Sequence, residues 1–388
     1  MGSLALLPAH PCGRLRLLHP AWTTRSSADE DRLRKPGRGS EVRAGLVGFP
    51  YAGKTTLFEA VAGPSRSGAI ASVPVPDPRL DLICQAVSPK KRTPAHLEMV
   101  DDAAVMPTPG SGRAADFAAS ARRVDVLVHV VREFESETVP YHSQPDPKRD
   151  HDSLVSELLF ADLHLVENRL ERLAKSQEAK KSGTQEYLEK ALFERLKTSL
   201  ENGTEVRRCE LTEQEGDLLL NYQLLTAKPL VVAVNCEESQ LRQRNAFEDS
   251  VASSGDPVFR VCCALEKELA ALEDEDRSAF LQDLGIETAA SGSLIRAVYQ
   301  ALGLITFFTA GQNETKAWPL KDGSTALKAA ATVHTDIAKG FIRAEVVGYE
   351  DFERLGSVKA CYDQGLMRLE GKEYRVRDGD IINIRNKS

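Results

Sequence analysis

The stretch VRAGLVGFPYAGKTTLFEAV, residues 42–61, decides the fold of this 388-residue chain. Residues 42–47 form a short apolar run that predicts a strand, and residues 54–61 have the apolar spacing of a helix. Between them, Gly48, Gly53, Lys54 and Thr55 satisfy the pattern G-x-x-x-x-G-K-[ST]. This order of strand, loop and helix is the context in which the pattern indicates a phosphate-binding loop. We therefore expect the chain to bind a purine nucleoside triphosphate.

Each residue of the pattern has a physical role in holding an anion. Gly48 and Gly53 let the backbone curl so that successive N–H groups point inward, and the helix that follows adds the partial positive charge of its N-terminus. Lys54 would place an ammonium group against the β and γ phosphates, and the Thr55 hydroxyl would offer one oxygen to Mg²⁺. A plain glycine turn does not require Lys54 and Thr55. We predict Lys54 as the catalytic residue and Thr55 as a metal ligand.

Two later strands end in polar residues that suit the same site. Asp101 follows the apolar run 97–100, where NTPases keep a carboxylate for Mg²⁺, although Asp101 or Asp102 could instead cap a turn. Asn235 and Glu238 follow the run 229–234. Guanine-specific proteins have N-K-x-D there, and this chain has no lysine after Asn235 and a glutamate in place of the aspartate. The longer carboxylate favours adenine over guanine.

The distribution of apolar runs predicts an α/β fold. Short runs at 97–100, 124–131, 229–234 and 258–261 lie between helical stretches, which is typical of a parallel sheet covered on both faces. After residue 303 the pattern changes to strands at 304–308, 341–347, 374–376 and 381–384 with one helix over 325–334. We expect a P-loop domain over 42–150 and 227–303, and a separate small domain over 304–388.

Residues 151–226 interrupt the expected sheet with a helical insertion, an antiparallel hairpin that projects as an arm. A second helix over 185–200 ends at Asn202-Gly203, which suits a left-handed cap, and Thr212 with Glu215 suits a capping box. In the first helix, apolar residues recur near helical period at Leu154, Leu158, Phe160 or Ala161, Leu165, Leu170 and Leu173.

Composition narrows the functional classes. The net charge of −7 argues against a protein that coats nucleic acid by bulk electrostatics, so any RNA contact must be local. The chain has no apolar run of about 18 residues, so we expect no membrane span. Seven scattered cysteines without C-x-x-C spacing predict neither a disulfide framework nor a zinc site.

The first 41 residues are predicted to lie outside the fold. Arg14, Arg16 and Arg25, with no acidic residue before Asp29, are typical of an organelle transit peptide, and a disordered leader fits equally. We expect a cytoplasmic protein, or one of the plastid or mitochondrial matrix if the leader is a transit peptide.

Several blocks in the same order resemble the YchF or Obg-like ATPase family of P-loop proteins, over almost all of 42–388. They are VPVPDPRLD, VDVLVHVVREFE, ELLFADLHLVENRLERL, PLVVAVN, GLITFFTAGQNETKAW, HTDIAKGFIRAEVVGYEDF and EGKEYRVRDGDIIN. The resemblance implies a G domain with an inserted helical arm and a C-terminal TGS domain of β-grasp type.

The resemblance also implies function and site residues. Members are similar in preferring ATP to GTP, in hydrolysing it slowly and in associating with ribosomes, so we expect ATP, with GTP as an alternative, and the ribosome or its RNA as partners. Asn235, Cys236 and Glu238 would line the base pocket, and the block CCALE from Cys262 would close over the base. The phosphates would be wrapped by Tyr51, Ala52, Gly53, Lys54, Thr55 and Thr56.

The sequence departs from the family pattern at both switches. The first switch is shortened to GPSRSGAIASVPV, residues 63–75, without a Mg²⁺-binding threonine, and Ser67 or Ser72 could substitute for it. The second-switch pattern D-x-x-G begins at Asp101 and has Ala104 in place of glycine. No glutamine is found to orient the attacking water. A nucleotide-binding scaffold without catalysis, which docks on RNA or the ribosome, is therefore the alternative to a slow ATPase.

Overall fold

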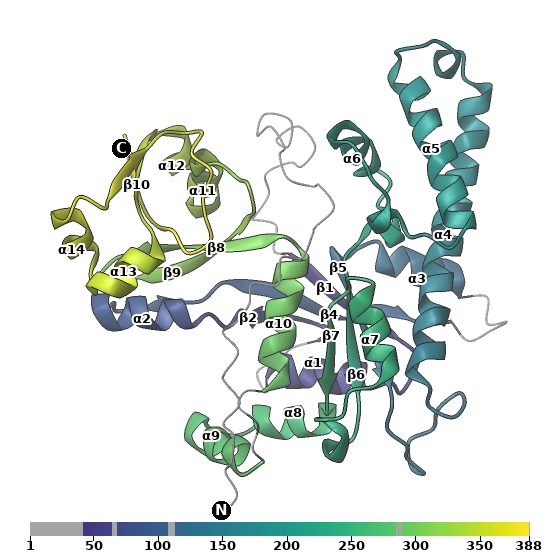
Figure 1. The fold of residues 1–388 in the computed structure, drawn as a ribbon, viewed down its shortest axis with the longest axis horizontal. Coiled ribbons are helices and arrows are strands. Elements are labelled where there is room, and N and C mark those ends of the chain that lie inside the picture. Colours follow the sequence, from purple (N-terminus) through teal and green to yellow (C-terminus); the bar gives the residue numbers. More distant parts are fainter. Residues whose placement is uncertain (1–41, 64–67, 108–112, 285, 287–288, 388) are drawn as a thin grey trace, which may run out of the picture.

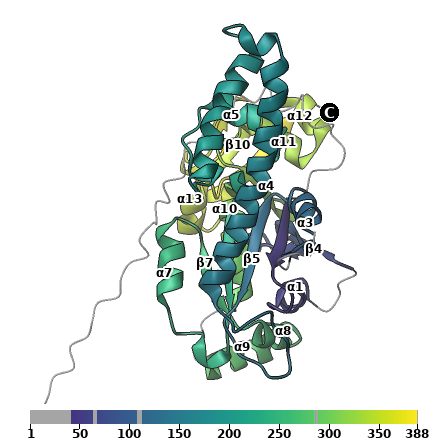
Figure 2. The same ribbon diagram turned by 90° about the vertical axis from the view of Figure 1, so that its right-hand side faces the viewer.

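The computed structural model describes residues 42–63, 68–107, 113–284, 286 and 289–387 (Figure 1). Two six-stranded sheets form its body, and a pair of long helices projects away from the first sheet (Figures 1 and 2). Within these ranges, every helix is too short or too polar to traverse a lipid bilayer. The predicted leader, residues 1–41, lies outside the described residues.

The first sheet has the order β2-β4-β1-β5-β6-β7, and all neighbouring strands are parallel except β2 and β4. The strands predicted at 42–47, 97–100, 124–131, 229–234 and 258–261 are confirmed as members of this sheet. β2 comes from the segment expected to act as the first switch, and it forms an antiparallel edge. The bounds are β1 (Arg43–Gly48), β2 (Ile70–Pro74), β4 (His96–Val105), β5 (Val126–Arg132), β6 (Leu230–Asn235) and β7 (Val258–Val261).

Helices cover both faces of the first sheet because successive strand residues point to opposite sides. In β5, for example, Val128 packs into one apolar cluster and Leu127 into the other. The first face carries α1 (Lys54–Ala62), α8 (Cys263–Ala270) and α10 (Ala290–Ala301). The second carries α3 (Ala114–Ala121), the first turns of α4 (Pro147–Lys175) and α7 (Ala246–Ser253). Helix α9 (Asp274–Asp283) follows α8.

The predicted helical hairpin is confirmed. Helix α4 packs against α5 (Gln185–Glu201), and α6 (Glu213–Leu219) begins at the predicted capping box between Thr212 and Glu215. Gly203 has the positive φ of a left-handed cap. Short 3₁₀ turns join the helices: η2 (Glu178–Lys180), η3 (Val206–Arg208) and η4 (Leu225–Ala227). The buried Asp162 carboxylate of α4 accepts the Leu225 and Thr226 N–H groups at 2.9 and 2.7 Å, which ties the end of the insertion to its beginning.

The structure decides which residue of α4 faces the core where the sequence left two choices. Ala161 packs against the apolar cluster of the second face, whereas Phe160 is 66% exposed. Leu154, Leu158 and Leu173 are buried as expected. The phase of the helix is set by Leu154 and Leu158 against the sheet, and Phe160 falls outside that stripe.

The second sheet has the order β11-β10-β12-β8-β9-β3. Its strands are β3 (Arg92–Thr93), β8 (Leu304–Ala310), β9 (Thr315–Lys321), β10 (Phe341–Val347), β11 (Arg368–Glu370) and β12 (Ile381–Asn386). One face packs on α11 (Ala326–Val333) and α12 (Thr335–Lys339). The other packs on α2 (Pro78–Val87), α13 (Tyr349–Leu355) and α14 (Val358–Asp363).

One strand expected for this sheet is wrong. Residues 374–376 are not a strand, since their only ladder contact is a single bridge from Arg375 to Thr325. The sheet also has three strands that the sequence analysis did not predict, β3, β9 and β11, and Pro319 lies within β9. A proline is tolerated there because β9 pairs fully with β8 only, and β3 covers just its first residues.

The two sheets share one apolar cluster. Val128 and Leu46 of the first sheet belong to the same cluster as Phe308 and Ile381 of the second, with Leu80 of α2 between them. The strand β3 and the helix α2 come from the segment between β2 and β4, so they belong to the first sheet by chain order and to the second by packing. The small C-terminal region is therefore held by more than its connection at residue 303.

We predict that Leu158→Ala lowers the free energy of unfolding by about 2–5 kcal/mol, because its side chain is fully buried against the first sheet. Phe160→Ala, two residues along the same helix, should change it by about 0.5 kcal/mol at most because that side chain is exposed. Guanidinium unfolding followed by far-ultraviolet circular dichroism measures both. Equal losses for the two variants would contradict the burial of α4 described above.

Candidate functional site: the loop after the first strand

The loop between β1 and α1 has the curled backbone that the sequence pattern predicts. Gly48 and Gly53 have φ values of 146° and 106°. A Cβ atom at Gly48 would lie 2.4 Å from the Val130 carbonyl oxygen, and one at Gly53 would lie 2.1 Å from Nδ2 of Asn235. Both positions therefore require glycine for its torsional freedom and for its lack of a side chain.

Lys54 lies inside the curl. Its ammonium group donates to the carbonyl oxygens of Gly48 at 3.0 Å and Phe49 at 2.8 Å, and the residue is only 8% exposed. Burial lowers the pKa of Lys54 to about 8, and the nearby Asp101 carboxylate partly offsets this effect. A buried cation held at the mouth of a glycine loop is suited to an anionic ligand, because the anion would restore the charge balance that burial disfavours.

The other predicted loop residues differ in exposure. Tyr51 is 60% exposed and has a φ of 62°, a left-handed conformation that is uncommon for a residue with a side chain. Thr55 is exposed on the first turn of α1, Thr56 is half-buried beside it, and Ala52 is buried. The Thr55 hydroxyl is thus accessible to a ligand in the loop.

Asn235 joins the loop to the segment predicted to close over the base. Its Nδ2 donates to the Ala52 carbonyl oxygen at 2.9 Å, and its Oδ1 accepts from the Cys263 N–H at 3.1 Å. The two bonds fix the orientation of the amide and use it within the protein. Asn235 is buried at the end of β6, so its role is to hold the loop against the start of α8.

Cys236 and Glu238, the other predicted base-pocket residues, have different surroundings. Cys236 is buried, and burial raises the pKa of its thiol to about 11, so it is a neutral packing group. Glu238 is exposed in the 3₁₀ turn η5 (Glu238–Gln240). Of the two, Glu238 is the side chain available to a ligand beside the loop.

Asp101 lies within β4 instead of at its end, which corrects the predicted strand boundary. The strand continues to Val105 because it pairs with both neighbours: the Asp101 N–H donates to the Ala69 carbonyl oxygen at 2.8 Å, and Val47 of β1 lies opposite Ala104. Asp101 is close enough to Lys54 to raise its pKa. Its Oδ1 is buried and, among the described residues, has no hydrogen-bond partner.

An oxygen of this kind suits a cation. No group of three or more His, Cys, Asp or Glu side chains that could hold a metal is found within the described ranges. A metal at Asp101 and Thr55 would therefore take its remaining ligands from a nucleotide and from water, which is how Mg²⁺ usually binds. These two residues fit such an ion.

Ser72, one of the two serines that could replace the first-switch threonine, lies far from Asp101 and Thr55. Ser72 of β2 lies opposite Glu98 of β4, and Glu98 lies opposite Arg43 at the start of β1. Gly48 is five residues further along β1, a separation of roughly 16 Å at about 3.3 Å per strand residue. Ser72 therefore cannot replace the expected threonine in this arrangement. Ser67 lies outside the described residues.

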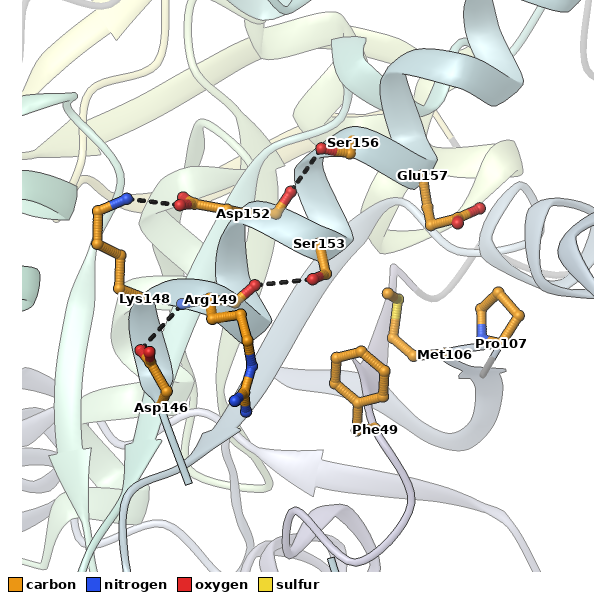
Figure 3. Close-up of a pocket in the computed structure, with 10 residues that line it drawn as sticks. All are labelled: Phe49, Met106, Pro107, Asp146, Lys148, Arg149, Asp152, Ser153, Ser156 and Glu157. Carbon is orange, nitrogen blue, oxygen red and sulfur yellow. Dashed lines mark hydrogen bonds and ion pairs between the residues drawn. The ribbon is translucent and has the colours of Figure 1, made fainter. Parts of the chain in front are cut away.

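A pocket of about 580 Å³, which no sequence pattern predicts, lies beside the loop (Figure 3). Phe49, Met106 and Pro107 face the first turns of α4 across it. Phe49 stacks on His142 with ring centroids 4.2 Å apart, and His142 lies 3.3 Å from the buried carboxylate of Asp150 in α4. The loop is thereby in contact with the base of the helical arm. The full lining is Phe49, Met106, Pro107, Asp146, Lys148, Arg149, Asp152, Ser153, Ser156 and Glu157.

His129 is fully buried in β5. Its Nδ1 lies 3.4 Å from Nδ1 of His151 in α4. Burial lowers the pKa of His129 well below its ordinary value, and the neighbouring His151 and Lys54 act in the same direction. This histidine is a neutral core residue between the loop strand and the arm.

Comparisons with known proteins agree on one family. A family model for YchF-GTPase_C, described as "Protein of unknown function (DUF933)", matches residues 304–387. The chain is 39% identical to the ribosome-binding ATPase YchF of Haemophilus influenzae, with 88% of this chain and 98% of that protein covered. It is 35% identical to Obg-like ATPase 1 of rice, Oryza sativa subsp. japonica, with 88% and 91% covered.

A solved structure supports the same assignment. The YchF GTPase of Schizosaccharomyces pombe superposes with a TM-score of 0.81 at 31% sequence identity, and the match covers 90% of this chain and 99% of that one. The glycine loop, the inserted hairpin and the second sheet are thus accompanied by similarity over nearly the whole described chain. The chain belongs to the YchF and Obg-like ATPase family of P-loop proteins.

Proposed function

We propose that this chain binds ATP in the loop between β1 and α1, hydrolyses it slowly, and uses the nucleotide state as a switch on the ribosome. The main support for this proposal is the buried Lys54 ammonium group, which lies inside a loop whose two glycines cannot be replaced without a steric clash. The relatives from Haemophilus influenzae and rice, named a ribosome-binding ATPase and an Obg-like ATPase, support this reading.

The metal half of the site would be made by Thr55 and Asp101. Mg²⁺ bound with the nucleotide would neutralise charge on the phosphates. Asp101 has a buried oxygen without a hydrogen-bond partner in the described part of the chain, and the Thr55 hydroxyl is exposed at the loop. Lys54 would hold the phosphates, and the loop N–H groups would orient them.

Base preference is the finer part of the proposal. The names of the relatives differ, because the rice and Haemophilus proteins are called ATPases and the yeast one a GTPase. Asn235 is bound to Ala52 and Cys263, so Glu238 is left as the polar side chain of this motif that is open to a base. Because a glutamate is longer than the aspartate that pairs with guanine, we propose ATP as the preferred nucleotide and GTP as the weaker one.

A nucleotide-binding scaffold without turnover is the second candidate, and the switch region favours it. Ala104, which occupies the glycine position of D-x-x-G, is part of β4 opposite Val47. Ser72 lies at the far end of the sheet from the loop, as described above. In this reading the nucleotide stabilises the fold, and the C-terminal TGS-like region docks on RNA or the ribosome.

We predict that wild-type protein binds Mg-ATP in calorimetric titrations about tenfold more tightly than Mg-GTP, a difference of about 1.4 kcal/mol. Lys54→Ala should lose roughly tenfold or more in affinity, because a hydrogen bond between charged groups is worth about 1.5–3 kcal/mol. Asp101→Asn should weaken Mg-ATP while leaving ADP in metal-free buffer unchanged. No affinity of the wild type for any purine triphosphate would refute the proposal.

Turnover separates the two candidates. Phosphate release with and without ribosomes, together with co-sedimentation, should show slow hydrolysis by the wild type and none above background by Lys54→Ala. Nucleotide protection against thermal unfolding with no phosphate release, even on ribosomes, would select the scaffold instead.

We further predict that Gly53→Ala abolishes nucleotide binding, because its Cβ would displace the Asn235 amide that holds Ala52. Gly63→Ala is the matched control: Gly63 also has a positive φ, but nothing lies within 4 Å of its added Cβ. That variant should bind ATP normally and lose about 1–3 kcal/mol of stability, because Gly63 has φ 70° and ψ −177°, a backbone conformation essentially confined to glycine. Equal ATP affinity in the two variants would contradict the role given to the Asn235 contact.

A further inference from the structure

Two sequence blocks that the nucleotide site does not use meet in space. VPVPDPRLD, residues 73–81, and EGKEYRVRDGDIIN, residues 370–383, lie on different sheets. They meet at Arg79 of α2 and Asp378, which are 299 residues apart in the chain. The proposed nucleotide site assigns no role to either block, so their contact needs a separate explanation.

Arg79 is held by two carboxylates at once. Its Nη1 and Nη2 donate to the two oxygens of Asp378 at 2.7 and 3.2 Å, and its Nε and Nη2 donate to the two oxygens of Asp77 at 2.9 and 2.8 Å. The guanidinium also lies 5.4 Å from the centre of the Phe308 ring in β8. This forked geometry is specific to the guanidinium group of arginine. Its paired hydrogen bonds to carboxylates are shorter and stronger than those of a typical surface ion pair.

Each of the two carboxylates also accepts a backbone N–H group, which fixes its position. Asp77 caps α2 by accepting the Arg79 N–H at 3.0 Å, and Asp378 accepts the Thr306 N–H of β8 at 2.8 Å. Gly379 has a φ of +88°, and a Cβ there would lie 3.2 Å from Nη1 of Arg79. The same Cβ would lie 3.1 Å from Cβ of Tyr349, so a side chain at this turn would crowd both residues.

The other end of this segment touches the nucleotide site. The Ala69 carbonyl oxygen accepts the Asp101 N–H, β2 then pairs with β4 from Ile70 to Pro74, and Asp77 begins α2 three residues later. One continuous stretch of nine residues, 69–77, thus has Asp101 at one end and Arg79 at the other. A shift of β2 at the metal side would act on Asp77 and, through Arg79, on Asp378 of the second sheet.

We propose that Arg79 is a positioning residue that couples the nucleotide site to the C-terminal sheet through Asp77 and Asp378. The inference rests on the proposed nucleotide site and adds a route by which its occupancy reaches residues 304–387. Arg79 does not touch the nucleotide. It links Asp77, which follows β2 in the chain and caps α2, to Asp378, which is bound to β8 of the second sheet.

Hydrogen exchange of the full chain with and without Mg-ATP tests this coupling. In the wild type, Mg-ATP should slow exchange in peptides that cover the glycine loop, residues 48–56. It should also slow exchange over 304–310 and 377–381, by roughly fivefold or more, the lower end of typical coupling between sites. In Arg79→Ala the loop should still be protected, and the response of the two C-terminal peptides should fall below about twofold.

A matched control is available in the same segment. Arg92 of β3 pairs with Asp81 of α2 at 2.7 Å, with side chains 48% and 52% exposed. Asp378 is equally exposed at 51%, but Arg79 is 25% exposed and also holds the 11% exposed Asp77. Arg92→Ala should therefore respond to Mg-ATP as the wild type does. Arg79→Lys keeps the charge and the fold but not the fork, so it should also lose most of the C-terminal response. It serves as the test if Arg79→Ala fails to fold. The double variant Arg79→Ala/Asp378→Ala should lose no more of the C-terminal response to Mg-ATP than either single variant does.

The outcomes separate the two proposals. If the loop is not protected in the wild type, the proposed nucleotide binding fails and this inference with it. If the loop is protected but the C-terminal peptides of Arg79→Ala and Arg79→Lys respond as in the wild type, or if wild-type C-terminal peptides do not respond, the coupling through Arg79 is overturned while nucleotide binding stands.

Discussion

The amide of Asn235 is the contact on which the nucleotide-binding half of this molecule depends. It reaches from the end of β6 to the Ala52 carbonyl oxygen in the glycine loop and to the Cys263 N–H at the start of α8. Gly53 must lack a side chain because this amide occupies the space where a Cβ would lie. Loop, strand and helix are therefore one unit, and the curl around Lys54 is held from outside the loop as well as by its own backbone.

The site has a well-built phosphate side and a sparse metal side. Lys54 is buried against two loop carbonyls, and Asp101 keeps one buried oxygen without a hydrogen-bond partner in the described chain. The switch residues that could complete the site are paired in the first sheet instead. Ser72 belongs to the edge strand β2, and Ala104 of β4 lies opposite Val47 of β1. The described residues therefore supply groups for binding the phosphates, and groups from a partner would be needed to complete a catalytic site.

The second sheet is joined to the first by packing as well as by chain connection. Phe308 and Ile381 share an apolar cluster with Val128, β3 adds an edge strand, and Arg79 closes the contact with paired charges. Independent domains usually meet through smaller and more polar surfaces. The helical arm has its own link, since Phe49 of the loop stacks on His142, which lies beside Asp150 of α4. The second sheet and the helical arm thus both contact elements next to the loop.

The sequence by itself determined the features that depend on neighbouring residues: the glycine loop, the buried parallel strands, and the capping box of Thr212 and Glu215. These follow from backbone sterics, side-chain periodicity and local hydrogen bonds, which operate over a few residues. It could also place Asn235 beside the loop, because parallel strands end at the same edge of a sheet, whereas Asp101 lies inside β4 and not at its end.

Only the tertiary structure decided what those residues do there. The amide of Asn235 is used by Ala52 and Cys263, α4 turns Ala161 inward and Phe160 outward, β9 accommodates Pro319, and Arg79 finds Asp378 299 residues away. Each of these outcomes is set by contacts between distant parts of the chain. Local propensity carries no information about such partners, because the free energy that selects them arises only when the sheets pack together.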